Sequence, residues 1–318
     1  MKSATGQPKM IAPGVYLIDT GFIRPQVNAN YLIYDGLTAA IVETGSSTTV
    51  PVLLEAIDSL GFQREKIQYV IVTHVHLDHA GGAGLLLREL PQARLVVHPR
   101  GARHMIDPSQ LIAGTRTIYG GTEFKRLYGN VLPVPEDRLI EAPDGFTLPV
   151  AGRVLSFLHT PGHAQHHLVV LDPTTHGIFT GDTFGVCYRE FNQDRQPFVF
   201  PMTTPVQFNP AALHQSLDRI LQQSPHQLFL THYGRITGDL CELVVKMHRL
   251  IDAFVAIALR YQDEEERLAK IYEALVKLLL SELRTHGSSL SRAQALKTWE
   301  LDLKLNAQGL ETWLERRS

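Results

Sequence analysis

The chain has 318 residues, 44% of them hydrophobic, and a formal net charge of −2 at pH 7. This length allows one large catalytic core with a smaller appended piece, and the composition is that of a globular chain rather than a disordered one. The near-neutral charge excludes a global attraction to nucleic acid or to an anionic membrane. We therefore expect a small-molecule substrate as partner, with no nucleic acid and no membrane.

The amino-terminal residues contain no apolar run of the kind found in a secretory signal. No segment of the sequence approaches the roughly 20 consecutive apolar residues of a membrane-spanning helix. Cys187 and Cys241 are the only cysteines, which is too few for a disulfide framework. These features predict a cytoplasmic protein with two reduced thiols.

Short apolar runs separated by Gly, Pro, Asn and Asp occupy the first 240 residues and predict many strands. A helix is expected over residues 50–60, where Leu53 and Ile57 share one helical face. Asn209 and Pro210 form a favourable N-cap and first-turn pair for a second helix. In chain order, the strands are predicted at residues 15–18, 31–34, 39–42, 68–73, 95–98, 154–159, 168–171, 178–180 and 228–231.

Beyond residue 240 the apolar residues recur at helical spacing. One helix is predicted from 240, a second after the acidic run 263–266, and a last one opening at Asn306. The chain is therefore predicted to consist of a catalytic domain over residues 1–240 and a C-terminal helical extension over residues 241–318. Apolar positions in this extension allow a homodimer.

Residues 70–82, VIVTHVHLDHAGG, place several potential metal ligands directly after an apolar strand. Imidazole and carboxylate groups suit zinc, iron or manganese, and a single tetrahedral ion cannot easily use all four ligands in this segment. The local sequence therefore predicts two metal ions. Three later apolar runs also end in Thr near a potential ligand, so the candidate ligands are His74, His76, Asp78, His79, His163, Asp182 and His232.

The motif order HxHxDH, TPGH, TGD and TH resembles that of the metallo-β-lactamase superfamily, over roughly residues 14 to 240. The resemblance implies an α/β fold, a four-layer αββα metallo-β-lactamase sandwich with a dinuclear metal site. By position, it implies one metal held by His74, His76 and His163. It further implies a second metal held by Asp78, His79 and His232, with Asp182 bridging the two.

The segment VETG at residues 42–45 departs from the family pattern, in which many members carry aspartate in place of Glu43. In the family this carboxylate orients the metal loop, as outer partners of ligating histidines generally do. Glu43 either does the same with one more methylene or simply closes a strand before a turn. The remaining histidines, including His214 and His248, are interpreted as structural or exposed, with His166 and His167 as candidate neighbours of the ligands.

Two cations about 3.5–4 Å apart can hold a bridging water, lower its pKa toward neutrality and polarise a carbonyl oxygen. In this interpretation Asp182 helps to place the nucleophile, and Asp78 orients the hydroxide or shuttles its proton. The ligand set looks more like the glyoxalase II group, which hydrolyses thioesters such as acylglutathione, and like lactonases than like zinc β-lactamases. We expect a metal-dependent hydrolase of a thioester, lactone or other ester, with zinc first and iron or manganese as alternatives.

The segments 101–135 and 188–195 combine aromatic and basic residues, which suits an acyl substrate with an anionic handle. Within them, Tyr119, Tyr188 and Arg189 are predicted to bind substrate, and Arg195 belongs to the same stretch. Each of these side chains also fits an ordinary solvated loop.

Other activities stay open at this point. A metal-dependent phosphodiesterase or ribonuclease uses the same dinuclear chemistry, although the near-neutral charge argues against it. An iron-dependent oxygenase or oxygen-binding protein of the same fold can retain this motif, while diiron flavoproteins often carry Glu where this chain has His76. A binding protein with incidental hydrolysis ranks last, because every predicted ligand is present.

Overall fold

The computed structural model describes residues 5–193, 196–204 and 206–317. Its contacts divide the chain into two compact units. Unit 1 comprises the residues up to 159, then 166–181 and 225–236, and unit 2 comprises 160–165, 182–224 and the residues after 236. These units differ from the predicted division at residue 240, since two segments before that point group with the C-terminal helices.

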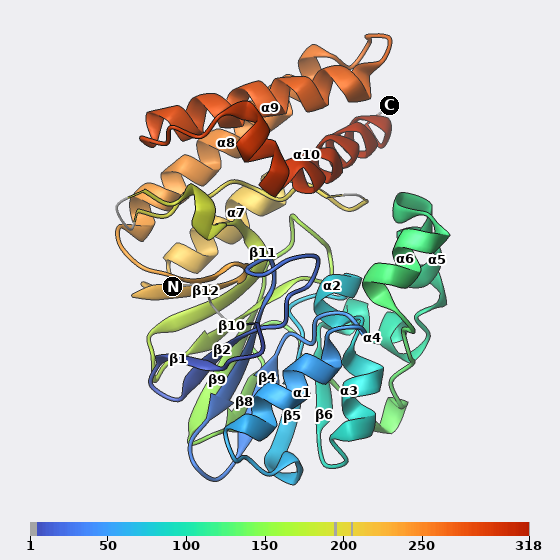
Figure 1. Cartoon of the computed structure of the whole chain (residues 1–318), viewed down its shortest axis with the longest axis vertical. Coiled ribbons are helices and arrows are strands. Elements are labelled where there is room, and N and C mark those ends of the chain that lie inside the picture. The colour runs from blue at the N-terminus through green and yellow to red at the C-terminus, as the bar shows by residue number, and fades with distance from the viewer. Residues whose placement is uncertain (1–4, 194–195, 205, 318) are drawn as a thin grey trace. The chain divides into compact units, whose positions relative to one another are not determined.

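Unit 1 contains a mixed sheet whose strands lie in sequence order, with helices on one face (Figure 1). The strands are β1 (Lys9–Ala12), β2 (Val15–Asp19), β3 (Ala29–Tyr34), β4 (Ala39–Val42), β5 (Ile67–Ile71), β6 (Arg94–Val97) and β7 (Leu139–Glu141). Strands β1 to β4 are antiparallel neighbours, whereas β4 to β7 run parallel. The buried apolar sides of α1 (Val50–Ser59) and α3 (Ala83–Glu89) form one core cluster with this sheet.

A second sheet has the order β13-β12-β11-β10-β9-β8. Its strands are β8 (Thr147–Val150), β9 (Arg153–His159), β10 (Leu168–Asp172), β11 (Gly177–Val186), β12 (Gln227–His232) and β13 (Gly234–Ile236). Strand β11 passes from unit 1 into unit 2 after Gly181. Each of β8 to β10 pairs antiparallel with the next strand in the chain, as does β12 with β13.

Aromatic rings from both sheets meet inside unit 1. The ring of Tyr31 on β3 lies 5.1 Å from Phe179 on β11 and 5.8 Å from Phe229 on β12. The Tyr31 hydroxyl donates a hydrogen bond to the carbonyl of Leu230, so its polar end is satisfied although the ring is buried. The two sheets therefore pack face to face, as the predicted fold requires.

The predicted strands all form, within one or two residues at most ends, apart from β11, which runs on to Val186. The sequence does not predict β1, β7, β8 and β13: β7 and β13 have three residues each, β8 contains Pro149, and in β1 only Ala12 is buried. Helices also form in a segment for which none was predicted: α4 (Pro99–Ile106), α5 (Ser109–Tyr119) and α6 (Gly121–Tyr128).

Unit 2 contains the helices α7 (Pro210–Leu221), α8 (Leu240–Arg260), α9 (Arg267–Thr285) and α10 (Arg292–Glu315), the last three coloured orange to red in Figure 1. Asn209 caps α7 as predicted, because its side chain accepts a hydrogen bond from Ala212 N at 3.0 Å. The buried Trp299 ring of α10 lies 4.5 Å from Phe191 and 5.9 Å from Phe200. This aromatic cluster explains why residues 182–204 group with the C-terminal helices.

The prediction that the last helix opens at Asn306 is wrong. Helix α10 begins at Arg292, after a capping box formed by Ser291 and Gln294. Asn306 is buried in the middle of the helix, where its Oδ1 accepts from Thr203 N at 2.6 Å and its Nδ2 donates to Pro201 O at 3.2 Å. The polar side chain that resembled a cap signal is used for a tertiary contact instead.

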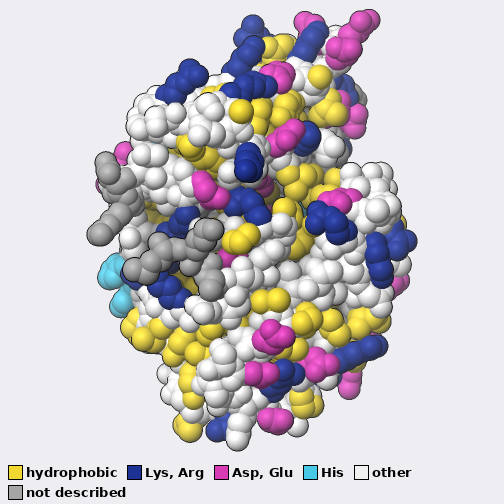
Figure 2. Space-filling view, viewed as in Figure 1, with side chains coloured by type: hydrophobic (Ala, Val, Ile, Leu, Met, Phe, Trp, Pro, Cys, Tyr) yellow, Lys and Arg dark blue, Asp and Glu magenta, His cyan; other side chains and the backbone are white. Residues whose placement is uncertain are grey.

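Among the described residues, no helix combines the length and the hydropathy needed to cross a bilayer. On the face shown in Figure 2, Lys and Arg side chains are interspersed with Asp and Glu side chains. This mixture on one face agrees with the near-neutral net charge of the sequence.

His98 links the fold of unit 1 to pH. Its Nδ1 caps α4 by accepting from Arg100 N at 3.0 Å. Burial, reinforced by the neighbouring His159, lowers the pKa of His98 from 6.5 to about 4. As the pH falls from 6.5 to 4, the unfolded chain therefore takes up a proton at this position before the folded protein does. The free energy of unfolding accordingly decreases over this range.

We predict that His98→Asn, which keeps a capping acceptor, reduces this loss of stability by up to roughly 3 kcal/mol between pH 6.5 and pH 4. Urea unfolding at a series of pH values measures the effect. His226→Asn, measured in the same series, is the matched control for replacing an exposed histidine. Equal slopes for His98→Asn and the wild type would contradict the assigned pKa.

Candidate metal centre

Three predicted ligands come together in unit 1: Asp78, His79 and His232. Asp78 and His79 lie on the short helix α2 (Leu77–Ala80), and His232 ends β12. The Nε2 atoms of His79 and His232 lie 3.5 Å and 3.4 Å from Asp78 Oδ2. One donor atom from each residue lies within 4.8 Å of the other two. This grouping is compatible with a single bound cation.

The hydrogen bonds on the far side of each ring fix which nitrogen faces the group. His79 Nδ1 lies 3.2 Å from Glu43 Oε1, and His232 Nδ1 lies 3.1 Å from the carbonyl of Val27. Since both oxygens only accept, each Nδ1 carries a hydrogen, and in the neutral form of each ring Nε2 then presents a lone pair to Asp78. Two lone pairs facing a carboxylate repel it unless a cation lies between them. The donor set therefore fits a divalent metal.

His74 and His76 form a second group in unit 1. His74 Nε2 and His76 Nδ1 lie 2.9 Å apart, so two ring nitrogens meet from alternate positions of the chain. On its other side, His74 Nδ1 lies 3.1 Å from Thr73 Oγ1, whose hydroxyl donates to Glu43 Oε1 at 2.5 Å. A chain of hydrogen bonds thus fixes the His74 ring with Nε2 free of the hydrogen.

The two other predicted ligands, His163 and Asp182, come together in unit 2. His163 Nε2 lies 3.4 Å from Asp182 Oδ2, and both side chains are buried. His163 Nδ1 lies 3.4 Å from the carbonyl of Met202 and 3.4 Å from Thr204 Oγ1. The ring therefore has the same arrangement as in unit 1, with Nδ1 toward oxygen and Nε2 toward a carboxylate.

Glu43 supports the ligands of unit 1. Its side chain is buried, and Oε1 accepts hydrogen bonds from Thr73 Oγ1 and, at 3.2 Å, from Thr231 Oγ1, in addition to its contact with His79. Its backbone has φ +66°, a left-handed conformation that is uncommon for residues other than glycine. These contacts support the first of the two interpretations of Glu43, in which its carboxylate orients the metal loop.

The turn after β4 also holds the backbone of the metal loop. Thr44 N donates to the carbonyl of His79 at 2.8 Å, and Gly82 N donates to the carbonyl of Gly45 at 2.9 Å. A Cβ at Gly82 would lie 2.6 Å from Val50 Cγ2 and 3.0 Å from the carbonyl of Thr44. Glycine is therefore needed at residue 82 for close approach.

His166 and His167 lie beside His74 in unit 1, with ring centroids 6.2 Å and 4.9 Å from it in stacked orientations. His166 Nδ1 also lies 3.5 Å from Val75 N. Both rings therefore pack around the ligand segment.

The predicted substrate residues lie in different surroundings. Tyr119 ends α5, and its ring lies 5.5 Å from Tyr128. Burial, Tyr119 and the negative charge of Asp78 raise the pKa of Tyr128 well above its usual range, so this ring is a neutral neighbour of the ligands in unit 1. Tyr128 lies in the segment 101–135, which is predicted to border the cleft.

Tyr188 and Arg189 belong to unit 2. Tyr188 is buried, and its hydroxyl donates to Asp302 Oδ1 of α10 at 3.1 Å. Arg189 is exposed at the start of the short helix η3 (Arg189–Phe191). Their role in substrate binding stays a prediction, and Arg195 lies outside the described residues.

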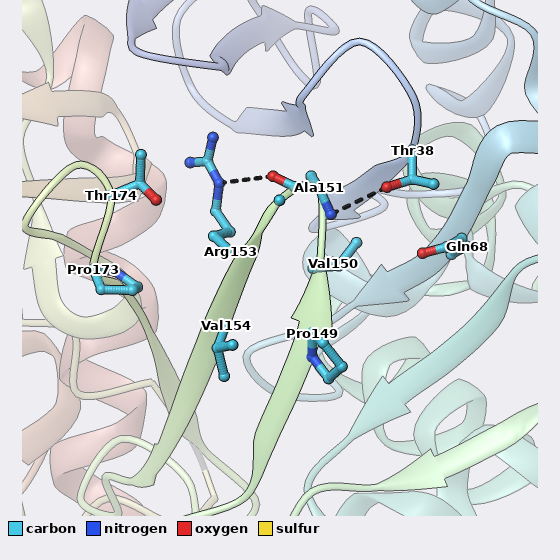
Figure 3. A pocket seen from close by; sticks show the side chains of 10 residues that line it. Thr38, Gln68, Pro149, Val150, Ala151, Arg153, Val154, Pro173 and Thr174 are labelled. Atoms are coloured by element: carbon cyan, nitrogen blue, oxygen red, sulfur yellow. Dashed lines mark hydrogen bonds between the residues drawn. The ribbon is translucent and has the colours of Figure 1, made fainter.

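A hollow of about 710 Å³ in unit 1 is lined by residues that include Gln68, Val154 and Thr174, and by none of the predicted ligands (Figure 3). It is bordered by the start of β5 and the start of β9, whereas the ligands follow the ends of β5 and β12. The Arg153 guanidinium at its edge is already paired with the buried Asp172 at 2.7 Å. We therefore place the chemistry at the ligand groups and not in this hollow.

Comparison with known proteins decides the family. The model of the metallo-beta-lactamase superfamily matches residues 23–232, which include every predicted ligand. The chain belongs to this superfamily. A metallo-beta-lactamase fold-containing protein of Sulfurisphaera tokodaii is 24% identical over 243 residues, covering 72% of this chain and 82% of the relative.

Two further relatives have names that state an activity. A hydroxyacylglutathione hydrolase of a Synechococcus strain is 28% identical over 166 residues, covering 52% of each chain. An atrochrysone carboxyl ACP thioesterase of Aspergillus chevalieri is 27% identical over 163 residues, covering 51% of this chain and 42% of the relative. The chain thus spans about half the length of these two relatives.

A solved structure supports the fold over nearly the whole chain. The archaeal metallo-beta-lactamase superfamily protein of Sulfolobus tokodaii superposes with a TM-score of 0.63 at 20% identity, covering 96% of this chain and 99% of the other. The predicted metallo-β-lactamase sandwich with C-terminal helices is therefore confirmed.

The role of the Glu43 contacts in metal binding can be tested by substitution. We predict that Glu43→Gln lowers metal affinity by about 10- to 100-fold, because the amide is uncharged and accepts the His79 and Thr73 hydrogen bonds less strongly. Competition with a chromophoric chelator measures the affinity, and circular dichroism checks the fold. Glu55→Gln on the exposed side of α1 is the matched control. Wild-type affinity in Glu43→Gln would show that this carboxylate does not support the metal.

Proposed function

We propose that the protein is a dinuclear metal-dependent hydrolase that acts on the carbonyl group of a thioester, lactone or other ester. The observation that carries this proposal is the group of Asp78, His79 and His232, in which two Nε2 atoms face one carboxylate oxygen. Such a set of neutral imidazoles and one carboxylate suits a divalent cation, with zinc expected first and iron or manganese also suitable.

We assign the other cation to His74, His76 and His163, with Asp182 shared between the two. This assignment rests on the motif order and on the arrangement within each unit. His74 and His76 meet through ring nitrogens in unit 1, and His163 meets Asp182 in unit 2.

A pair of divalent cations supplies hydroxide at neutral pH and polarises the substrate carbonyl. The residues of the chain position this chemistry. Asp78 and Asp182 are acceptors that can orient the attacking oxygen and receive its proton. The Nδ1 contacts of His79 and His232 prevent the rings from turning.

The relatives support carbonyl ester chemistry. Two of them are a thioesterase and a hydroxyacylglutathione hydrolase by name, and Asp182 is the predicted bridging carboxylate. A small-molecule acyl substrate fits these activities. A cytoplasmic location, with Cys187 and Cys241 both free, is part of the same proposal.

The proposal is tested by purifying the full chain without added metal and measuring metal content together with turnover of thioesters, lactones and bis(p-nitrophenyl) phosphate. We expect two metal equivalents and carbonyl ester turnover. His76→Ala should lose metal and lower turnover by more than about 100-fold, because even outer partners of ligands are worth 10- to 100-fold. His226→Ala should behave as the wild type.

Two results would overturn the proposal. Less than one metal per chain in every metal-supplemented preparation would exclude a dinuclear site. A single iron with oxygen uptake and no ester turnover would replace the hydrolase by an oxygenase, since zinc alone cannot activate oxygen.

A further inference from the structure

Two histidines outside the predicted ligand set face each other in unit 2. His214 on α7 and His248 on α8 have nearly parallel ring planes, with centroids 4.8 Å apart and Nδ1 atoms 2.5 Å apart, so the rings meet edge to edge through these nitrogens. On the outer sides, His214 Nε2 lies 3.0 Å from Asp252 Oδ1, and His248 Nε2 lies 2.9 Å from Asp218 Oδ1. The four side chains form one row of carboxylate, imidazole, imidazole and carboxylate.

When both rings are neutral, this row contains two negative carboxylates and no positive charge. It contains three close contacts, and each needs one hydrogen if it is a hydrogen bond. Two neutral imidazoles supply only two hydrogens, and carboxylates supply none. With both Nε2 hydrogens directed at Asp218 and Asp252, the two Nδ1 lone pairs face each other. The arrangement therefore calls for one added cation between the rings.

We propose that His214 and His248 bind one divalent transition-metal ion through their Nδ1 atoms, with Asp218 and Asp252 holding the rings through Nε2. Carboxylates in this position orient metal-bound imidazoles and increase their basicity. Two nitrogen ligands at 2.0–2.1 Å in a tetrahedral shell lie about 3.3 Å apart, so the rings must separate by somewhat less than 1 Å. The side chains of Asp218 and Asp252 are 56% and 74% exposed and can follow this movement.

The partial exposure of the two imidazole rings also leaves room for the remaining ligands of the metal ion. The side chains of His214 and His248 are 25% and 26% exposed, so water can supply the remaining ligands. Such a site binds more weakly than a fully protein-bound structural zinc site, because only two ligands come from the chain. The imidazole pair favours zinc, copper or nickel over magnesium or calcium.

The site lies on the helix that supports the His163 loop. Asn209 N, at the start of α7, donates to the carbonyl of Gly162 at 2.8 Å, and Ser216 Oγ donates to the carbonyl of Pro161 at 2.6 Å. A Cβ at Gly162 would lie 2.4 Å from Leu213 Cα. A cation joining α7 to α8 would therefore also hold the backbone next to a predicted catalytic ligand.

The chain offers a control in another pair of neighbouring histidines. His176 and His226 are exposed, and their ring centroids are also 4.8 Å apart. In the described part of the chain, however, no carboxylate contacts either ring. If proximity of two surface histidines were sufficient, both pairs would bind metal equally.

The test uses the full-length protein saturated with zinc, freed of excess metal and then titrated with zinc in a calorimeter, with elemental analysis of the final complex. We expect the wild type and His226→Ala to bind one zinc more than His248→Ala. Asp218→Asn should retain this zinc with about 10- to 100-fold lower affinity. Added zinc should raise the apparent Tm of the wild type more than that of His248→Ala.

The proposal is independent of the hydrolase assignment. In His76→Ala the extra zinc should persist although the catalytic metal is reduced, so loss of one site is distinguishable from loss of the other. Equal zinc stoichiometry in the wild type, His248→Ala and Asp218→Asn would overturn the proposal and leave a shared proton as the cation between the rings.

Discussion

The carboxylate of Glu43 joins side chains from two segments that are distant in sequence: the metal loop, with Thr73 and His79, and β12, with Thr231. A buried carboxylate is costly unless it is hydrogen-bonded, and here the donors that satisfy it also fix the metal loop and the end of β12. Through Thr73 the same group fixes the His74 ring. The ligands of unit 1 thus share one buried anchor, and the left-handed backbone at Glu43 is retained because these contacts hold it.

The histidines predicted as ligands follow a common rule in both units. One ring nitrogen contacts an oxygen acceptor, which is Val27 O for His232, a carboxylate oxygen of Glu43 for His79 and Met202 O for His163. The other ring nitrogen faces the ligand group. An imidazole held in one tautomer needs no reorganisation when a cation binds. Because backbone carbonyls supply two of these acceptors, the fold itself sets the ring orientation, and the side chains at residues 27 and 202 need no particular chemistry.

Unit 2 connects the C-terminal helices to segments that contain predicted catalytic residues. Trp299 packs on Phe191 and Phe200, Asn306 binds the backbone of Thr203, and Tyr188 contacts Asp302. The helical extension therefore shares one core with these residues. The row of His214 and His248 with their carboxylates lies in the same unit and provides a means for metal to act on α7.

The sequence by itself indicated most of the strands, the start of α7 and the candidate ligands, because period-2 alternation, capping and motif spacing are local properties. Other features depended on contacts between residues far apart in the chain. Glu43 and Thr231 are 188 positions apart, His214 and His248 are 34 apart, and Asn306 and Thr203 are 103 apart. Local patterns do not record which distant donor a buried polar group meets. The tertiary structure therefore decided that Glu43 is a support for the ligands, that Asn306 is an anchor rather than a cap, and that two apparently ordinary surface histidines form a row with two carboxylates.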